Sequence, residues 1–306
     1  MKKILVATQK PFAPAAVNSI KEIAESAGYE FELFEKYAEQ ADFVKAVATA
    51  NALIIRSDKV TKEVIDAAKN LEILVRAGAG YDNVDLEAAT AKGVVVMNTP
   101  GQNSNAVAEL AFGMMVYLAR NAYNGSAGTE LKGKKLGIHA YGNVGKYVAR
   151  IAKGFGMKVY AFDPYVKKKA IKKDKVKPVK SVEKLYAKCQ YVSLHIPANE
   201  HTKESINYDL LKSMPENAVL VNTARKEVIN EADMIKLMAE RSDFSYISDI
   251  APDNKADFEQ FAGRYFFTPK KMGAQTSEAN INAGVAAANQ IAAFFKNGDT
   301  TFKVNN

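Results

Sequence analysis

The chain has 306 residues, of which 48% are hydrophobic and 25% charged, an ordinary composition for a globular protein large enough to form two domains. Its single cysteine, Cys189, excludes an intrachain disulfide and favours a reducing, cytoplasmic location. The formal net charge is +8, but residues 167–180 hold eight lysines, one acid and no aromatic residue, which argues against a nucleic-acid surface, and no apolar run is long enough to span a membrane.

Short apolar runs alternate with helical patterns in the first third of the chain. The predicted strands are 4–7, 31–34, 52–55, 73–75 and 94–96, and the predicted helices lie near 14–27, 40–48, 61–69 and 85–92. This alternation predicts a parallel sheet with helices on both faces. A helix that is apolar on nearly every side follows at 105–120, and we expect it to be buried between other elements or across a subunit interface.

A second series of strands begins at Leu136. It continues at 159–162, 191–194, 218–221, 246–247 and 266–267, with helices near 143–154, 181–187, 207–213 and 230–239. The sequence therefore predicts an α/β protein with two doubly wound parallel-sheet domains. We expect a flavodoxin-like substrate domain of residues 1–98 and 276–306, which includes the alanine-rich last helix, and an inserted Rossmann domain of residues 99–275.

Residues 136–145 read Leu-Gly-Ile-His-Ala-Tyr-Gly-Asn-Val-Gly, a strand followed by a glycine-rich turn and a helix. Free N–H groups at the start of such a helix bind a pyrophosphate, and Asp163, 21 residues beyond Gly142, is placed to accept from a ribose hydroxyl. The acid favours NAD over NADP, because it would repel a 2′-phosphate. The first glycine of the usual pattern is Ala140, where we expect a negative φ and a slightly remodelled turn.

Three more positions carry candidate chemistry. Arg225 follows the strand 218–221 and can hold a 2-hydroxy or 2-keto acid through a planar two-point contact, or else cap the next helix. His195 follows the strand 191–194 and either contacts the cofactor or is satisfied by backbone. Lys270 or Lys271 can present an amine to a substrate, and the alternative is a solvated lysine pair at the entrance to the last helix.

Together these patterns resemble the D-isomer-specific 2-hydroxyacid dehydrogenases, most closely the phosphoglycerate branch. The resemblance covers nearly the whole chain and is strongest in residues 55–57, 76–85, 97–100, 103–104, 108–110, 142–145, 163–164, 195–197, 222–225 and 273–274. It implies an NAD-dependent oxidoreductase that converts D-3-phosphoglycerate to 3-phosphohydroxypyruvate, the first step of serine biosynthesis, and a homodimer. Because the chain ends at Asn306, the regulatory domains of longer family members are not expected.

The resemblance also implies roles for single residues. Arg225 binds and polarises the 2-oxygen and the carboxylate of the substrate, the backbone amides of Ala79 and Gly80 bind the carboxylate, and Arg56 and Ser57 face the phosphate. The implied cofactor-binding residues are Gly142, Asn143, Val144, Gly145, Asp163 at the adenine ribose, His195, Thr223, and Asp249 at the nicotinamide amide. No metal is implied.

Two positions depart from the family. Its acid–base histidine precedes Leu/Ile-Gly-Ala, and a gapless fit to residues 272–274 places Lys271 there. The glutamate that pairs with this histidine falls on Asn254, with Asp253 just before it and of open role. Loss of a carboxylate partner helps a lysine to lose its proton, so Lys271 is predicted as the acid–base residue. A glyoxylate or hydroxypyruvate reductase and a non-catalytic NAD-sensing scaffold are the alternatives.

Overall fold

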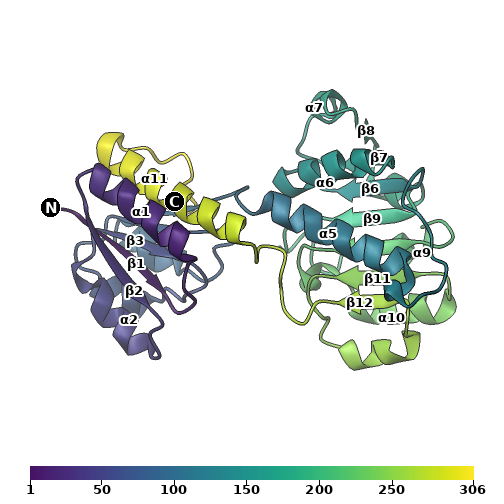
Figure 1. Ribbon diagram of the computed structural model, residues 1–306, viewed down its shortest axis with the longest axis horizontal. Helices are drawn as coiled ribbons and strands as arrows, with labels where there is room; N and C mark the ends of the chain where they lie inside the picture. Colours follow the sequence, from purple (N-terminus) through teal and green to yellow (C-terminus); the bar gives the residue numbers. More distant parts are fainter. The chain divides into compact units, whose positions relative to one another are not determined.

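The computed structural model describes residues 1–306, and the chain divides into two compact units. Unit 1 comprises Met1–Asn103 and Gln275–Asn306, so both ends of the chain belong to it, and unit 2 comprises Ser104–Ala274. Figure 1 distinguishes the units by colour, with the purple and yellow ends of the chain in unit 1 and the teal and green middle in unit 2. None of the helices has both the length and the apolar character to cross a membrane.

Unit 1 contains a five-stranded parallel sheet in the order β2-β1-β3-β4-β5, the flavodoxin-like order predicted from the sequence. The strands are β1 (Lys3–Thr8), β2 (Glu30–Glu35), β3 (Ala52–Ile55), β4 (Ile73–Arg76) and β5 (Val95–Asn98). Strand β3 is buried along its whole length, because helices cover both faces of the sheet.

Two helical layers cover this sheet. The helices of unit 1 are α1 (Pro14–Ser26), α2 (Gln40–Ala46), η1 (Val47–Thr49), α3 (Lys62–Ala67), α4 (Leu86–Ala91) and α11 (Ser277–Asn297). The first helix and the last lie side by side in Figure 1 and share one apolar core that includes Ile20 and Ala287. Residues of α2, α3 and α4, among them Phe43 and Val64, form a second core with the remaining side chains of β1 and β3.

Unit 2 contains a seven-stranded parallel sheet in the order β12-β11-β10-β9-β6-β7-β8. The strands are β6 (Lys135–His139), β7 (Lys158–Phe162), β8 (Lys177–Pro178), β9 (Tyr191–Leu194), β10 (Val219–Asn222), β11 (Ser245–Ser248) and β12 (Tyr265–Phe267). This is the Rossmann order extended by one strand, with the reversal between β6 and β9, which confirms the predicted fold class. The two-residue edge strand β8 has no apolar run, and the sequence analysis missed it.

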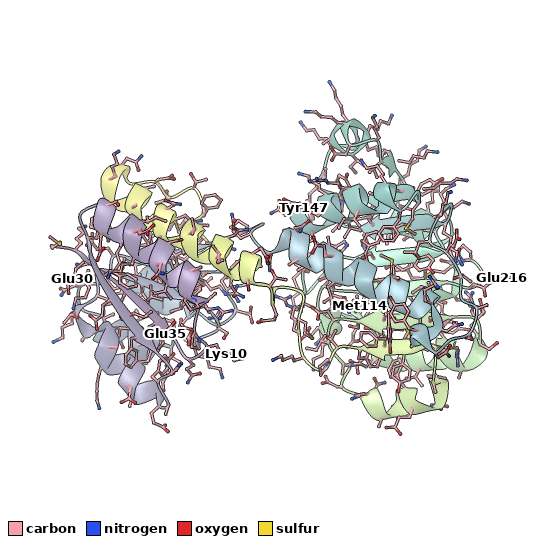
Figure 2. All side chains as sticks on the ribbon, viewed as in Figure 1. Lys10, Glu30, Glu35, Met114, Tyr147 and Glu216 are labelled. Carbon is pink, nitrogen blue, oxygen red and sulfur yellow. The ribbon has the colours of Figure 1, made fainter.

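Helices cover both faces of this second sheet as well. They are α5 (Ser104–Ala119), η2 (Asn121–Tyr123), α6 (Asn143–Gly154), α7 (Lys168–Lys173), α8 (Val182–Tyr186), α9 (Tyr208–Lys212), η3 (Lys226–Val228), α10 (Glu231–Glu240) and η4 (Lys255–Phe261). Helix α5 packs against α6, and its Met114, labelled in Figure 2, belongs to their common core. Helices α8, α9 and α10 contribute Leu185, Leu211 and Met234 to a separate core.

The turn at Ala140 differs from the expectation of a negative φ. Its φ is +77°, so the alanine adopts the left-handed conformation that the missing glycine would have adopted, and the prediction was wrong. The turn is held from several sides, because Ala140 N–H donates to the carbonyl of Phe162 at 2.9 Å and Tyr141 N–H donates to Asp163 at 2.7 Å. These contacts hold residue 140 in the left-handed conformation that glycine favours, so the backbone of the alanine is sterically strained.

We expect Ala140→Gly to stabilise unit 2 by up to about 1 kcal/mol, since the left-handed penalty of roughly 1–2 kcal/mol exceeds the added chain entropy of glycine, about 0.5–1 kcal/mol. Gly133 offers a matched control, because its φ is +78° and an added Cβ would meet no atom within 4 Å. Gly133→Ala should therefore destabilise the protein. Chemical denaturation measures both changes, and a destabilising Ala140→Gly would contradict the assignment of strain.

Candidate active site

The glycine-rich turn of unit 2 leaves a row of amide groups open to a ligand. Helix α6 begins at Asn143, and its N-cap residue Gly142 has no side chain to accept from the first-turn N–H groups. An added Cβ at Gly145 would lie 2.5 Å from the carbonyl oxygen of Ala140, so only glycine allows the helix to start this close to β6. Gly142 and Asn143 are exposed, and the arrangement suits a pyrophosphate.

Asp163 lies directly after β7 and is half-buried. Its Oδ2 accepts from the N–H of Tyr141 in the glycine-rich turn, and its Oδ1 accepts from the N–H groups of Tyr165 at 2.8 Å and Val166 at 3.0 Å. The carboxylate therefore holds the pyrophosphate turn against the end of β7. It lies at the position where an acid accepts from the adenine ribose in this fold.

His195 and Thr223 follow the neighbouring strands β9 and β10. The Nε2 of His195 is 3.0 Å from the hydroxyl of Ser193, and its Nδ1 is 3.5 Å from the hydroxyl of Thr223. Burial lowers the pKa of His195 to about 3, with a smaller contribution from nearby His139, whose own pKa burial lowers to about 4. Burial therefore favours the neutral imidazole at both positions.

Asn222 shapes the turn that carries Arg225. It is buried at the end of β10, where its Oδ1 accepts from the N–H of Ala224 at 2.9 Å and its Nδ2 donates to the carbonyl of Arg225 at 2.9 Å. The Arg225 guanidinium donates back to the carbonyl of Ala224 at 3.1 Å and is half-buried. The side-chain amide of Asn222 therefore fixes the backbone of this turn at the carboxyl end of the sheet.

Asp249 holds the segment that carries the two candidate lysines. It follows β11, is 1% exposed, and accepts from the N–H of Met272 at 2.6 Å and of Gly273 at 2.7 Å, one with each carboxylate oxygen. The hydroxyl of Thr268 is 3.1 Å from the same carboxylate. Both carboxylate oxygens of Asp249, which would accept a hydrogen bond from the amide of a nicotinamide, already accept from the backbone of this segment.

The segment held by Asp249 and the turn held by Asn222 bring Lys271 and Arg225 together. The Nζ of Lys271 donates to the carbonyl of Ala224, the same oxygen that accepts from Arg225. An amine and a guanidinium therefore meet at the carboxyl end of the sheet that carries the pyrophosphate turn. The side chain of Lys270 is exposed and forms no hydrogen bond or ion pair.

Asp253 forms an ion pair with Lys226 and raises the pKa of that lysine through a hydrogen bond. The turn of Asp253 and Asn254 is held by Glu231, whose carboxylate accepts from their N–H groups at 3.0 and 3.1 Å. The sequence analysis left the role of Asp253 open, and the structure places its exposed carboxylate on Lys226.

Unit 1 presents two unpaired amides where the resemblance implies carboxylate binding. The N–H groups of Ala79 and Gly80 donate to no acceptor in the protein. Their loop is held by Asn98, whose Nδ2 donates to the carbonyl of Ala79 at 2.7 Å, and by Thr99, whose N–H donates to the carbonyl of Gly78 at 3.0 Å. Adjacent free N–H groups of this kind form an anion-binding concavity.

Arg56 lies at the same carboxyl end of the unit 1 sheet but is already engaged. Its guanidinium donates to the carbonyls of Lys10 at 3.0 Å and Pro11 at 2.9 Å and to the side chain of Asn280, and burial lowers its pKa. Figure 2 labels Lys10 in this region. The Nε hydrogen and one Nη2 hydrogen are left for a ligand. Ser57 beside it is exposed.

The sequence analysis assigned no role to several residues that shape these sites. Buried Asp58 accepts from Gln9 N–H, from Tyr37 and from Arg56 N–H, and so fixes the backbone beside the Arg56 side chain. Arg76 donates from Nε to the Arg56 carbonyl at 3.0 Å. Asp58 lies three residues beyond β3, Asn222 is the last residue of β10 and Asp249 follows β11, so the sequence signal that they share is an acid or amide near the carboxyl end of a buried strand.

A family model, curated relatives and a solved structure all place this chain in the same family. A family model described as D-isomer specific 2-hydroxyacid dehydrogenase, NAD binding domain, matches residues 101–264. A hydroxypyruvate reductase of Thermotoga maritima is 32% identical over 282 residues, which cover 86% of this chain and 90% of that protein. A D-3-phosphoglycerate dehydrogenase of Methanocaldococcus jannaschii is 33% identical over 82% of this chain and 51% of its own length.

A solved structure agrees over the whole chain. The NAD⁺-bound 3-phosphoglycerate dehydrogenase of Entamoeba histolytica superimposes with a TM-score of 0.90 at 48% identity and covers 100% of this chain and 99% of its own. The chain spans about half the length of the curated D-3-phosphoglycerate dehydrogenases that it matches. The resemblance seen in the sequence is confirmed: the chain belongs to the D-isomer specific 2-hydroxyacid dehydrogenases, an NAD-dependent family.

Proposed function

We propose that the chain oxidises D-3-phosphoglycerate to 3-phosphohydroxypyruvate with NAD, the first step of serine biosynthesis. The observation that carries this proposal is the pairing of Lys271 and Arg225 on the carbonyl of Ala224, at the carboxyl end of the sheet that presents the pyrophosphate turn. An amine that exchanges a proton and a guanidinium that stabilises an oxygen are the two groups that oxidation of a 2-hydroxy acid requires.

NAD supplies the hydride acceptor when it is bound at the start of α6. Neutral Lys271 takes the proton of the substrate hydroxyl, and in the reverse direction its ammonium returns it. Arg225 contacts the same oxygen and stabilises it as it becomes a carbonyl. The unpaired amides of Ala79 and Gly80 bind the carboxylate of the substrate.

The substrate phosphate is assigned to Arg56 and Ser57. The 3-phosphoglycerate dehydrogenase of E. histolytica, 48% identical to this chain, supports a phosphorylated substrate. One observation favours a second candidate, hydroxypyruvate reduction, because the guanidinium of Arg56 already donates to three acceptors within the protein and leaves few donors for a phosphate. The hydroxypyruvate reductase of T. maritima supports the same alternative.

Unit 1 is accordingly proposed as the substrate domain and unit 2 as the NAD-binding domain. The homodimer and the cytoplasmic location implied by the family resemblance and by the single cysteine stay predictions.

The role of Lys271 is tested by substitution. We expect Lys271→Ala to lower kcat by roughly 10²–10⁴-fold, the usual contribution of a general base, with the Kd of NAD unchanged. Lys270→Ala is the matched control and should retain activity, because its side chain is exposed. In the wild type, oxidation should accelerate well above pH 7, since the ammonium group of a lysine must lose its proton before the amine can act as a base. Full activity of Lys271→Ala, or a rate plateau near pH 7, would contradict this assignment.

The phosphate assignment is tested by comparing two substrates. Arg56→Gln should raise the KM for 3-phosphohydroxypyruvate by about tenfold or more, because a charge-assisted contact is lost, and leave the KM for hydroxypyruvate nearly unchanged. Steady-state reduction with NADH measures both constants in one preparation. If the wild type turns over hydroxypyruvate more efficiently, the reductase is favoured over the phosphoglycerate dehydrogenase, and if both KM values rise equally, Arg56 does not contact the phosphate.

The role of Asp249 is tested with Asp249→Asn, which leaves only one oxygen for the two N–H groups of Met272 and Gly273. We expect a loss of stability of about 1–3 kcal/mol for the buried unpaired group and a lower kcat, because the Lys271 segment is released. Thr268→Val, which removes one neutral hydroxyl, should have a smaller effect. A weaker affinity for NAD at unchanged kcat would show instead that Asp249 acts at the nicotinamide.

A further inference from the structure

Four lysines line a cavity of about 580 Å³ at the surface of unit 2. The lining residues are Lys135, Pro178, Val179, Lys180, Lys184, Ala187, Lys188 and Pro215. Lys135 is the first residue of β6, whereas the pyrophosphate turn follows the last residue of the same strand. Pro178, elsewhere in the lining, is the last residue of β8 and pairs with Ala161 of β7, so the cavity extends along the sheet, and none of the residues assigned to the NAD site lines it.

Close packing of the segment 182–189 on β6 brings these charges together. Gly137 in β6 makes this possible, since an added Cβ would lie 3.0 Å from Leu185 Cγ and 3.2 Å from Cys189 Cβ. Leu185 and Cys189 are fully buried against the strand. Lys184 in α8 and Lys188, two residues beyond the end of that helix, are both exposed.

The charge of the cavity is not balanced within the protein. None of the four ammonium groups forms a hydrogen bond or an ion pair, and no acid lines the cavity. The Nζ of Lys188 lies 5.3 Å from the centre of the Tyr160 ring, a cation–π contact that leaves its positive charge without a counter-ion. Like charges gathered at one surface repel each other, and a bound anion would offset this repulsion.

The remaining lining residues are apolar. Pro178, Val179, Ala187 and Pro215 form a surface without charge between the lysines. A phosphate group carries about −1.5 to −2 charges, so two or more phosphates are needed to balance four lysines. A volume of about 580 Å³ lies in the range of small-molecule sites, roughly 300–1,000 Å³. An anion with several phosphates and a flat, weakly polar part matches these properties.

We propose that this cavity is a second ligand site, separate from the NAD site, which binds a nucleoside triphosphate through Lys135, Lys180, Lys184 and Lys188. The lysines contact the phosphate chain as point charges, and the base packs on the apolar surface. The proposal does not depend on which 2-hydroxy acid the protein oxidises.

The test is a calorimetric titration of the full chain, saturated with NAD so that the dinucleotide site is closed to other nucleotides. The two probes are ATP without magnesium and inorganic tripolyphosphate. The variant Lys180→Gln/Lys184→Gln/Lys188→Gln removes three charges from the cavity. Lys168→Gln/Lys169→Gln/Lys172→Gln removes three charges from α7, whose lysines do not line the cavity. Thermal melts confirm that both variants are folded, and Lys188→Gln alone is a milder second test.

We expect ATP to bind the wild type more tightly than tripolyphosphate does. The cavity variant should lose about tenfold or more in affinity, while the α7 variant stays within about twofold of the wild type. Equal losses in both triple variants would show diffuse attraction by positive charge and overturn the site. Equal affinity for the two probes would overturn the nucleotide assignment, and no heat of binding with either probe would overturn the proposal as a whole.

Discussion

The chemistry proposed for unit 2 depends on the hydrogen bonds from Met272 and Gly273 to the buried carboxylate of Asp249. A lysine side chain has many rotamers and loses considerable entropy when it is held in one place. Here the restraint acts on the backbone, because charge-assisted bonds from two consecutive amides set the path of residues 271–273. Asn222 does the same for the turn of Arg225, so both functional side chains extend from backbone that neighbouring strand ends hold in place.

The local charge balance fits a lysine better than a histidine. A histidine base benefits from a carboxylate that stabilises its protonated form, whereas a lysine needs help in losing its proton. The family resemblance implies that Asn254 stands at the glutamate position, and the neighbouring carboxylate of Asp253 is bound to Lys226. The Arg225 guanidinium donates to the same carbonyl oxygen as the Lys271 amine.

Hydrophobic patterning alone predicted the two parallel sheets, because strands such as β3 and β10 are buried on both faces and consist mainly of consecutive apolar residues. It failed where tertiary contacts decide the outcome. Ala140 takes a left-handed conformation because Phe162 and Asp163 hold the turn on both sides, which no local preference reveals. The positions of Arg225 and Lys271 were predictable from motifs, but the acceptor that they share follows only from the folded backbone.

Strand β8 has a consequence for how the protein behaves at high concentration. It is the outer strand on one side of the seven-stranded sheet, and an exposed outer strand is a template onto which a foreign chain can add. Here only Lys177 and Pro178 form it, the proline offers no N–H, and further lysines flank it along the chain. Intermolecular growth of the sheet from this side is therefore blocked by a missing donor, by the shortness of the strand and by electrostatic repulsion between copies.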